Sequence, residues 1–265
     1  MAITTQDALI AGRGSKRQGF IFARTSIANQ AAGTLCSLYR AAGGPPAQPA
    51  IPTTAALPDD TLSFVFTNPS GADTTYLDTF SGVTTGGGGV LMTYDRLFHI
   101  GGLNGTLTTA QAVNSQTVLS TWPVRGAPAV ECEWFLENYS DTGATATTAT
   151  VAVTYSDATT GTVSVAVPTN WRAGRLLPIP PPQGKYVASV QSVTLAATTG
   201  TAGNFGVTAG DRKSDATLYL PQANLGASRE AVFTTVPNDM CFWHVFLCTG
   251  TSTGDIRGEF SLIQG

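Results

Sequence analysis

The chain has 265 residues, of which 42% are apolar and only 12% are charged, and its net charge is −3. This length allows one large domain with a substantial core, and the apolar content excludes a disordered chain. The charged share is about half of the usual 25%, which predicts that another subunit covers part of the surface. We expect no membrane span, because no stretch approaches about 20 consecutive apolar residues, and no secretory signal, because MAITTQDALIAG has no basic region followed by an apolar one.

Residues 1–58 are predicted to form an N-terminal docking arm. Residues 4–11 favour a short helix with Thr4 as its N-cap and Gly12 as its end. The segment from Ser26 to about Ala42 fits a helix, although its second half, TLCSLYR, fits a strand as well. Residues 43–58 are rich in proline and alanine, which predicts an extended strap that crosses a neighbour's surface.

The charge of the chain is unevenly distributed. Residues 1–40 carry a net charge of +4, so the remainder carries −7. A basic end on an acidic body predicts contact with an acidic partner, and a solvated flexible end is the alternative. The side chains expected to dock are basic or aromatic: Arg13, Lys16, Arg17, Phe20, Phe22 and Arg24.

Residues 59–265 are predicted to form one all-β domain, because short alternating apolar runs are separated by Gly, Pro, Asn and Asp. Strands are expected at about 61–67, 89–97, 129–137, 147–155, 162–167, 188–197 and 241–248. This number of strands at short spacing indicates a two-sheet sandwich of jelly-roll type.

The clearest strand signals are at residues 147–167, where Val and Tyr alternate with Thr and Ser on both sides of a turn. This period of two predicts a hairpin with one buried face and one hydroxyl-bearing face. In VECEWFLEN, alternation predicts that Trp134 points inward and that Glu131, Glu133 and Glu137 share the wet face. MCFWHVFLC is apolar on both faces, which predicts a central strand or one covered by another subunit.

No pattern in the sequence carries catalytic or metal-binding chemistry. His244 lies in an aromatic run, which favours a core position, and His99 has Asp95 nearby but no nucleophile motif. The four cysteines lie in apolar surroundings without metal-ligand spacing, so buried reduced thiols are expected. We therefore expect no enzyme activity, no cofactor and no metal ion.

Binding of sugars or nucleic acids receives little support from the sequence. Trp122 and Trp171 stand at predicted strand ends and are the two tryptophans that could form an exposed platform for a sugar, although a core position is favoured. A basic stretch interleaved with aromatics occurs only around residues 12–22, so nucleic acid is not expected as a partner.

Four phrases of the sequence resemble a family of tailed-bacteriophage virion proteins encoded near the major capsid protein. They are MAITTQDALIAG, SLYRAAGGPPA, DRLFHIGGLNGTLTTAQAVNS and SVQSVTLAATTGTAGNFGV. The similarity extends to about Val207 and does not cover residues 211–265. It implies a non-enzymatic virion component, of the head decoration (cement) type, that sits as a trimer on the capsid.

The sequence thus predicts a virion structural protein, assembled in the bacterial host cytoplasm, whose partners are the major capsid protein or other virion proteins. A tail or baseplate protein of the same particle is the nearest alternative. A carbohydrate-binding module or glycosidase is the alternative from another class, and it predicts an exposed Trp122 or Trp171.

Overall fold

A computed structural model describes residues 3–26, 31–44, 50–221, 226–251 and 254–265. Within these residues the chain is built of antiparallel strands with one α-helix, α1 (Gln6–Ser15), and the 3₁₀ turns η1 (Asp60–Leu62), η2 (Ser115–Thr117) and η3 (Ala129–Glu131). The predicted all-β sandwich is confirmed, and it is made of three packed sheets.

The three sheets are formed by strands that are far apart in the sequence. The five-stranded sheet has the order β13 (Gly226–Val236), β4 (Thr75–Thr84), β15 (Asp255–Gln264), β1 (Arg17–Thr25) and β3 (Gly43–Gly44). The closed barrel contains β10 (Arg175–Pro178), β2 (Leu35–Ser37), β14 (Phe242–Cys248), β5 (Gly89–Leu103), β12 (Asn204–Leu220) and β7 (Cys132–Ser140). The four-stranded sheet has the order β6 (Gln111–Ala112), β11 (Val187–Leu195), β8 (Thr147–Tyr155) and β9 (Thr160–Val167).

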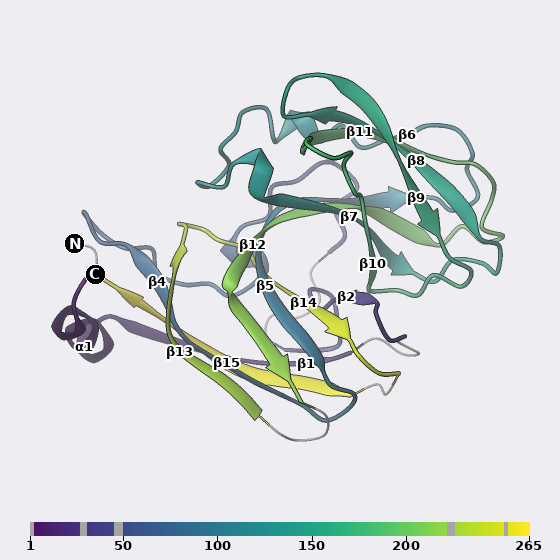
Figure 1. Ribbon diagram of the computed structural model, residues 1–265. Coiled ribbons are helices and arrows are strands. Elements are labelled where there is room, and N and C mark those ends of the chain that lie inside the picture. Colours follow the sequence, from purple (N-terminus) through teal and green to yellow (C-terminus); the bar gives the residue numbers. More distant parts are fainter. Residues whose placement is uncertain (1–2, 27–30, 45–49, 222–225, 252–253) are drawn as a thin grey trace.

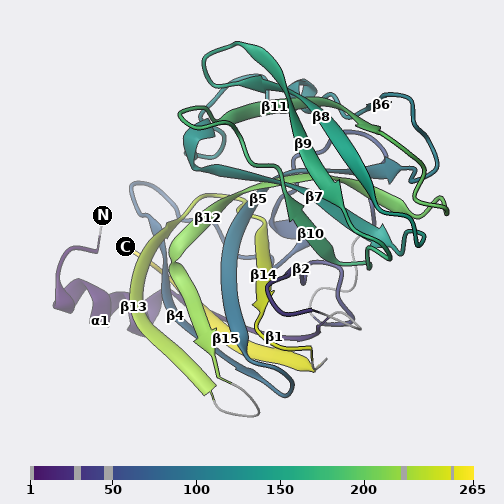
Figure 2. The ribbon, with the colours of Figure 1, turned by 45° about the vertical axis from the view of Figure 1, so that its right-hand side comes forward.

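The barrel is the middle layer, with the four-stranded sheet on one side and the five-stranded sheet on the other (Figure 1). Each gap between layers holds its own apolar core, and a third cluster fills the barrel interior. Strands β5 and β12 have 15 and 17 residues and contribute to both outer cores. From a second angle the five-stranded sheet curves under these long strands (Figure 2).

The predicted hairpin at residues 147–167 is confirmed as β8 and β9, which pair from Thr147↔Val167 to Thr154↔Thr160. The alternate residues Val151 and Val163 face each other in the core, and Thr150 and Ser164 face each other on the exposed side. β-Branched residues fit this half-buried pleated surface, and the inward valines pack in the core between the barrel and the four-stranded sheet.

Strand β7 differs in one respect from the sequence-based expectation, and strand β14 agrees with one of the two expected arrangements. β7 has a second buried face, because it closes the barrel, and Glu137 lies there with 1% exposure beside Arg96 rather than on a wet face. β14 is central as predicted, and its second face is covered by the barrel interior of the same chain. This strand therefore needs no other subunit to bury it.

The N-terminal segment does not form a separate arm. β1 pairs along its whole length with β15, from Arg17↔Ile263 to Thr25↔Asp255. The alternation of Phe20 and Phe22 with Gly19 and Ile21 is that of a strand with one core face. The expected boundary at residue 58 is thus corrected, because the chain enters the β body at Arg17.

Helix α1 starts and ends later than the sequence indicated. Its N-cap is Thr5, whose Oγ1 accepts a hydrogen bond from the Ala8 amide at 3.1 Å. Gly12 lies inside the helix, where a Cβ would come within 3.4 Å of the Gln264 carbonyl oxygen. This glycine allows α1 to pack against the end of β15, rather than ending the helix.

The segment between β1 and η1 follows the body of its own chain. Residues 27–30 of the helix expected from Ser26 to about Ala42, and residues 45–49 of the strap, lie outside the described residues. The described part of the expected helix contains the strand β2 instead, so the alternative strand in TLCSLYR is confirmed. Ala56 exchanges two backbone hydrogen bonds with His99 on β5, at 3.1 and 3.0 Å. The described part of the strap therefore runs across the chain's own β5.

The strand predicted at 61–67 is wrong, although its alternation is real. Phe64 and Phe66 are buried and Val65 is exposed, but the segment begins as η1 and joins no sheet. Asp59 caps η1, and the Asp60 carboxylate accepts from the Phe66 amide at 3.3 Å. Side-chain acceptors here satisfy backbone donors that a strand would use for a ladder.

Candidate docking surface

The outer face of the five-stranded sheet is the surface best shaped for a partner. Strand register places three rows of side chains on it, running across β13, β4, β15 and β1. The middle row consists of Ser228, Ser81, Glu259 and Ile21. The neighbouring rows consist of Gly226, Val83, Arg257 and Ala23 on one side, and of Glu230, Thr79, Ser261 and Gly19 on the other. Ser261 is the buried member of this last row, and its hydroxyl contacts that of Thr79 at 2.6 Å. We call these twelve residues the outer face.

Small side chains make this face shallow and open, because the strands' bulky residues point the other way. Phe22, Phe80 and Phe260 lie on the opposite side of the sheet, in the core. At Gly258 a Cβ would lie 2.6 Å from the Phe22 ring, so this glycine makes room for the ring beneath β15. The core side of the sheet is therefore tightly packed, and its outer face carries mostly small side chains.

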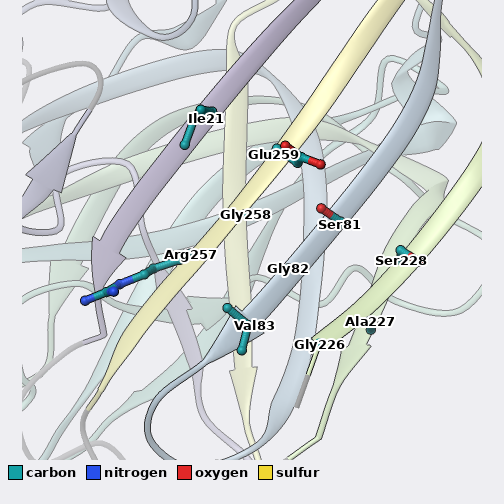
Figure 3. A pocket seen from close by; sticks show the side chains of 10 residues that line it. All are labelled: Ile21, Ser81, Gly82, Val83, Gly226, Ala227, Ser228, Arg257, Gly258 and Glu259. Atoms are coloured by element: carbon teal, nitrogen blue, oxygen red, sulfur yellow. The ribbon is translucent and has the colours of Figure 1, made fainter. Parts of the chain in front are cut away.

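Two adjoining hollows follow the outer face. The first, with a volume of about 470 Å³, runs between β13, β4, β15 and β1. Figure 3 shows its lining, with Ser81 and Glu259 near its centre, Ser228 at one edge and Arg257 extending to the other side. The second, of about 390 Å³, shares Ile21 and Glu259 with the first and continues to Arg17 and Thr79.

The polar and apolar groups of the outer face leave it free to contact a partner. Ile21 is 71% exposed, which is unusual for an isoleucine in the middle of a strand. Arg257 is paired with Asp255 at 2.8 Å, and both side chains remain partly exposed. In the described part of the chain, Glu259 forms no ion pair. A partner would therefore meet a face with one apolar anchor and charges of both signs.

Helix α1 closes one end of the outer face. The Arg13 guanidinium donates two hydrogen bonds to Asp78 on β4, from Nε at 3.0 Å and from Nη2 at 2.6 Å. The Asp78 side chain is fully buried, while that of Arg13 is about one-third exposed. Lys16, just after the helix, is paired with Asp73, and this bond lowers the pKa of the Asp73 carboxyl to about 2.

The six residues predicted to dock are thus distributed over both faces of the sheet. Arg17 is exposed beside the outer face, and Arg13 and Lys16 are used in ion pairs within the chain. Phe20 stacks on Phe260 at 4.9 Å, on the core side of β1. Phe22 is 0% and Arg24 is 6% exposed, so neither can reach a partner while the sheet is intact.

The sequence prediction named residues of β1 as docking residues, but it placed them in an arm and did not separate the two faces of a strand. The signal was present in QGFIFA, where Gly19 and Ile21 alternate with the two phenylalanines. The rest of the outer face comes from residues 79–83, 226–230 and 257–261, and only the strand register brings these segments together.

The histidines considered as catalytic groups are both buried. His99 lies between the rings of Tyr39 and Tyr139, with centroids 6.0 and 5.4 Å away. Burial, and then the charges of Arg96 and Arg40, hold the pKa of His99 well below 6.5. Burial lowers the pKa of His244 to about 3. Both rings are therefore neutral at pH 7.

The carboxylates considered as catalytic groups are engaged in contacts within the fold. Asp95 does not face His99 but accepts two hydrogen bonds from Arg125, at 3.1 and 2.6 Å. Glu133 accepts a hydrogen bond from the Tyr94 hydroxyl at 2.8 Å.

The two tryptophans considered as sugar platforms are part of the fold. Trp171 is 1% exposed, and its Nε1 donates to the Arg175 carbonyl at 3.2 Å. Trp122 is half-buried against the core between the barrel and the four-stranded sheet, and its Nε1 donates to the Ala188 carbonyl at 3.2 Å. The sugar-binding alternative predicts an exposed Trp122 or Trp171, whereas Trp171 is buried and Trp122 is half-buried.

All four cysteines are buried thiols, as predicted. The Sγ atoms of Cys36 and Cys248 are 3.1 Å apart, in the core beneath the five-stranded sheet. Among the described residues, no three His, Cys, Asp or Glu side chains are grouped so that they could hold a metal ion. Nor does any helix in the described part have the length and apolarity needed to cross a membrane.

Comparison with known proteins gives no family assignment. No family model matches the chain, and no curated protein sequence matches it.

Among solved structures, it is similar to a mutant VP2 protein of infectious bursal disease virus in T=1 particles, at 11% identity and a TM-score of 0.16. That alignment covers 94% of this chain and 78% of the viral chain. The structure of the Gt strain of the same virus gives 11% identity, a TM-score of 0.16 and coverages of 94% and 82%. Likeness at this TM-score carries no argument about the chain.

Proposed function

We propose that the chain is a non-enzymatic structural protein of a virion, and that it docks on the particle through the outer face of its five-stranded sheet. The observation that carries the proposal is this face itself, an open surface of small side chains around the exposed Ile21. The resemblance of the sequence to phage virion proteins encoded near the major capsid protein supports the same function.

A face of this kind suits a permanent structural contact. Glycine, alanine, serine and threonine lose little side-chain entropy when a partner covers them, so more of the contact energy is retained. Small side chains also let a partner approach the sheet closely, and the hydroxyl groups of Ser81, Ser228 and Thr79 can hydrogen-bond across the contact. Ile21 would fill a pocket of the partner and act as an anchor.

The groups that could carry out chemistry have structural tasks instead, which supports a non-enzymatic role. Glu137 neutralises the buried Arg96, and Asp95 binds Arg125. Arg125 in turn donates hydrogen bonds to the carbonyls of Pro58, Arg96 and Asp239, so it joins three separate segments.

Within the particle, we propose that the protein is a head decoration protein that stabilises the capsid, with the major capsid protein as its partner. This finer assignment, and the trimeric state, rest on the resemblance described above. The charge-poor composition supports burial against other subunits. A tail or baseplate position would use the same surface.

Substitution on the outer face tests this function. A Cβ at Gly19 would meet no atom within 4 Å, so Gly19→Lys places a long cation on the face without disturbing the fold. We expect this variant to lose binding to particles in a co-sedimentation assay, at least tenfold in affinity. The control is Ser164→Lys on the exposed face of β9, which adds the same charge elsewhere and should bind like the native chain.

The proposal is contradicted if Gly19→Lys occupies particles as fully as the native protein. Electron microscopy of the same particles then distinguishes a head from a tail position. Loss of particle binding in both lysine variants would point to a general effect of charge instead of the outer face.

A further inference from the structure

A small polar pocket lies at one end of the barrel, away from the outer face. It has a volume of about 260 Å³ and is bordered by the end of β1, the 37–42 segment that follows β2, and β7. Arg40 and Glu137 are its charged lining residues. This volume accommodates a few water molecules or one small ion.

Arg40 lines this pocket without any partner of its own. Within the described residues, its guanidinium forms no hydrogen bond and no ion pair. All 17 Asp and Glu residues of the chain lie in the described part, so no acid is available elsewhere to neutralise it. The Arg40 side chain is half-exposed, so part of it lines the pocket instead of facing open solvent.

A second arginine, Arg24 on β1, does not line the pocket but is hydrogen-bonded to a residue that does. Arg24 is buried, and no carboxylate in the described part of the chain pairs with it. Its Nη1 donates to the carbonyl of Ala41 at 3.0 Å, and Ala41 lines the pocket. A buried cation without a counter-ion is costly, because its desolvation is not repaid by an opposite charge.

The third arginine, Arg96, lies behind Glu137 in the barrel interior. Its Nη2 is paired with Glu137, its Nε donates to Thr208 at 2.9 Å, and its buried Nη1 has no hydrogen-bond partner. Glu137 also accepts from the Tyr139 hydroxyl at 3.1 Å. Glu137 is therefore already neutralised by Arg96, and Arg24 and Arg40 remain uncompensated.

Two hydroxyl groups complete the lining. Ser37 Oγ accepts a hydrogen bond from Trp243 Nε1 at 2.9 Å, and Ser26 Oγ accepts one from the Gly254 amide at 3.1 Å. Each of these hydroxyls still has its own proton to donate. The pocket thus combines the unneutralised guanidinium of Arg40 with two hydroxyl donors, and the unneutralised Arg24 is bonded to its Ala41 lining.

We propose that this pocket binds a small tetrahedral oxyanion of the phosphate class. Arg40 contacts the anion directly and the two serines donate hydrogen bonds, while Arg24, bonded to the Ala41 carbonyl, adds positive charge outside the lining. Guanidinium groups suit this ligand, since their fork of N–H donors matches two oxygens of a phosphoryl group. A bound anion would tie the 37–42 segment to β1 and β7 and so stabilise that end of the barrel.

The test uses the full chain and inorganic phosphate as the probe. Isothermal titration calorimetry and thermal unfolding are measured in phosphate and in chloride at equal ionic strength. We expect saturable binding of one phosphate, and an unfolding midpoint that rises with phosphate concentration beyond its value in chloride. Arg40→Gln should weaken phosphate binding about tenfold or more, because a charge-assisted contact is lost.

The matched control is Arg212→Gln, which removes an equal charge from an exposed position of β12 that lines none of the pockets described above. It should bind phosphate like the native chain. A nucleoside monophosphate as a second ligand distinguishes a free ion from the phosphoryl group of a larger molecule, and binding of either supports the oxyanion site. Equal midpoints in phosphate and chloride, or equal losses in both arginine variants, would overturn the proposal.

Discussion

The His244 ring lies in the core beneath the five-stranded sheet, 4.6 Å from the ring of Phe22 and stacked on Phe80. Burial, followed by the charge of Arg24, lowers the pKa of His244 from 6.5 to about 3. Below pH 6.5 the unfolded chain therefore binds a proton that the folded chain does not bind until the pH approaches 3. The stability contributed by this difference is lost as the pH falls through that window.

Replacing His244 with phenylalanine should remove this pH dependence, since phenylalanine fits an aromatic cluster and does not titrate. Between pH 6 and pH 4 the free energy of unfolding of the native chain should fall more steeply than that of the variant, by up to about 1.4 kcal/mol per pH unit. Urea unfolding at a series of pH values measures both slopes. Parallel slopes would show that His244 is already protonated in the folded chain.

The ion pair of Arg96 and Glu137 is the second residue-scale feature that can be tested. Both side chains are almost fully buried in the barrel, and Arg96 also packs over the Tyr39 ring, 4.3 Å from its centroid. Arg96→Met alone should cost about 3–5 kcal/mol in the free energy of unfolding, because it leaves an uncompensated buried carboxylate. Adding Glu137→Leu should recover most of that loss.

Denaturant unfolding of the two single variants and the double variant gives the coupling between these residues. If the double variant is no more stable than Arg96→Met, the guanidinium stabilises the barrel by packing on Tyr39 and Trp243 and not by neutralising Glu137.

At the scale of elements, α1 and β1 are adjacent in sequence but differ in their importance for the fold. α1 lies on the surface and is attached through Arg13 and Gly12. β1 lies inside the sheet between β15 and β3 and carries Phe22 into the core. Removal of residues 1–15 should therefore leave a cooperatively folding β protein, while removal of residues 1–25 should not.

Circular dichroism during thermal unfolding distinguishes the two truncations. The shorter truncation should keep a β-type spectrum and a sharp transition, and the longer one should lose the transition because β15 loses a neighbour along its whole length. A sharp transition in the chain that lacks residues 1–25 would mean that β1 is dispensable, as expected for a separate arm.

Elements whose sequence pattern is local could be predicted from the sequence, and elements that are recognised only through distant partners could not. β8 lies at Thr147–Tyr155 as predicted, because its alternation and its turn to β9 are encoded within twenty residues. β1 and β15 are more than 200 residues apart, and no local pattern shows that they pair. The same limit hid the outer face, which exists only once four distant strands are in register.

At the scale of the whole molecule, the barrel joins two sandwiches that share β5 and β12. One outer sheet, built on β8 and β9, presents alternating hydroxyl groups to solvent, and the other presents the outer face with Ile21. The two exposed sheets lie on opposite sides of the barrel (Figure 1). A protein docked through one of them would display the other away from the particle.

The oligomeric state belongs to the same scale. If the chain assembles as a trimer, light scattering at micromolar concentration should give three times the mass of 27.4 kDa. The Gly19→Lys variant should keep that mass if the outer face contacts the particle and not another copy of the chain. A lysine variant that becomes monomeric would assign the outer face to the contact between copies.

The proposed docking is tested most directly by a cryo-electron microscopy map of the protein bound to the virion particles that are its proposed partner. The account predicts density of a neighbouring virion protein against the outer face, in contact with Ile21, Ser81 and Glu259, with the β8–β9 sheet exposed to solvent. A map in which the outer face is exposed and the β8–β9 sheet contacts the particle would contradict it.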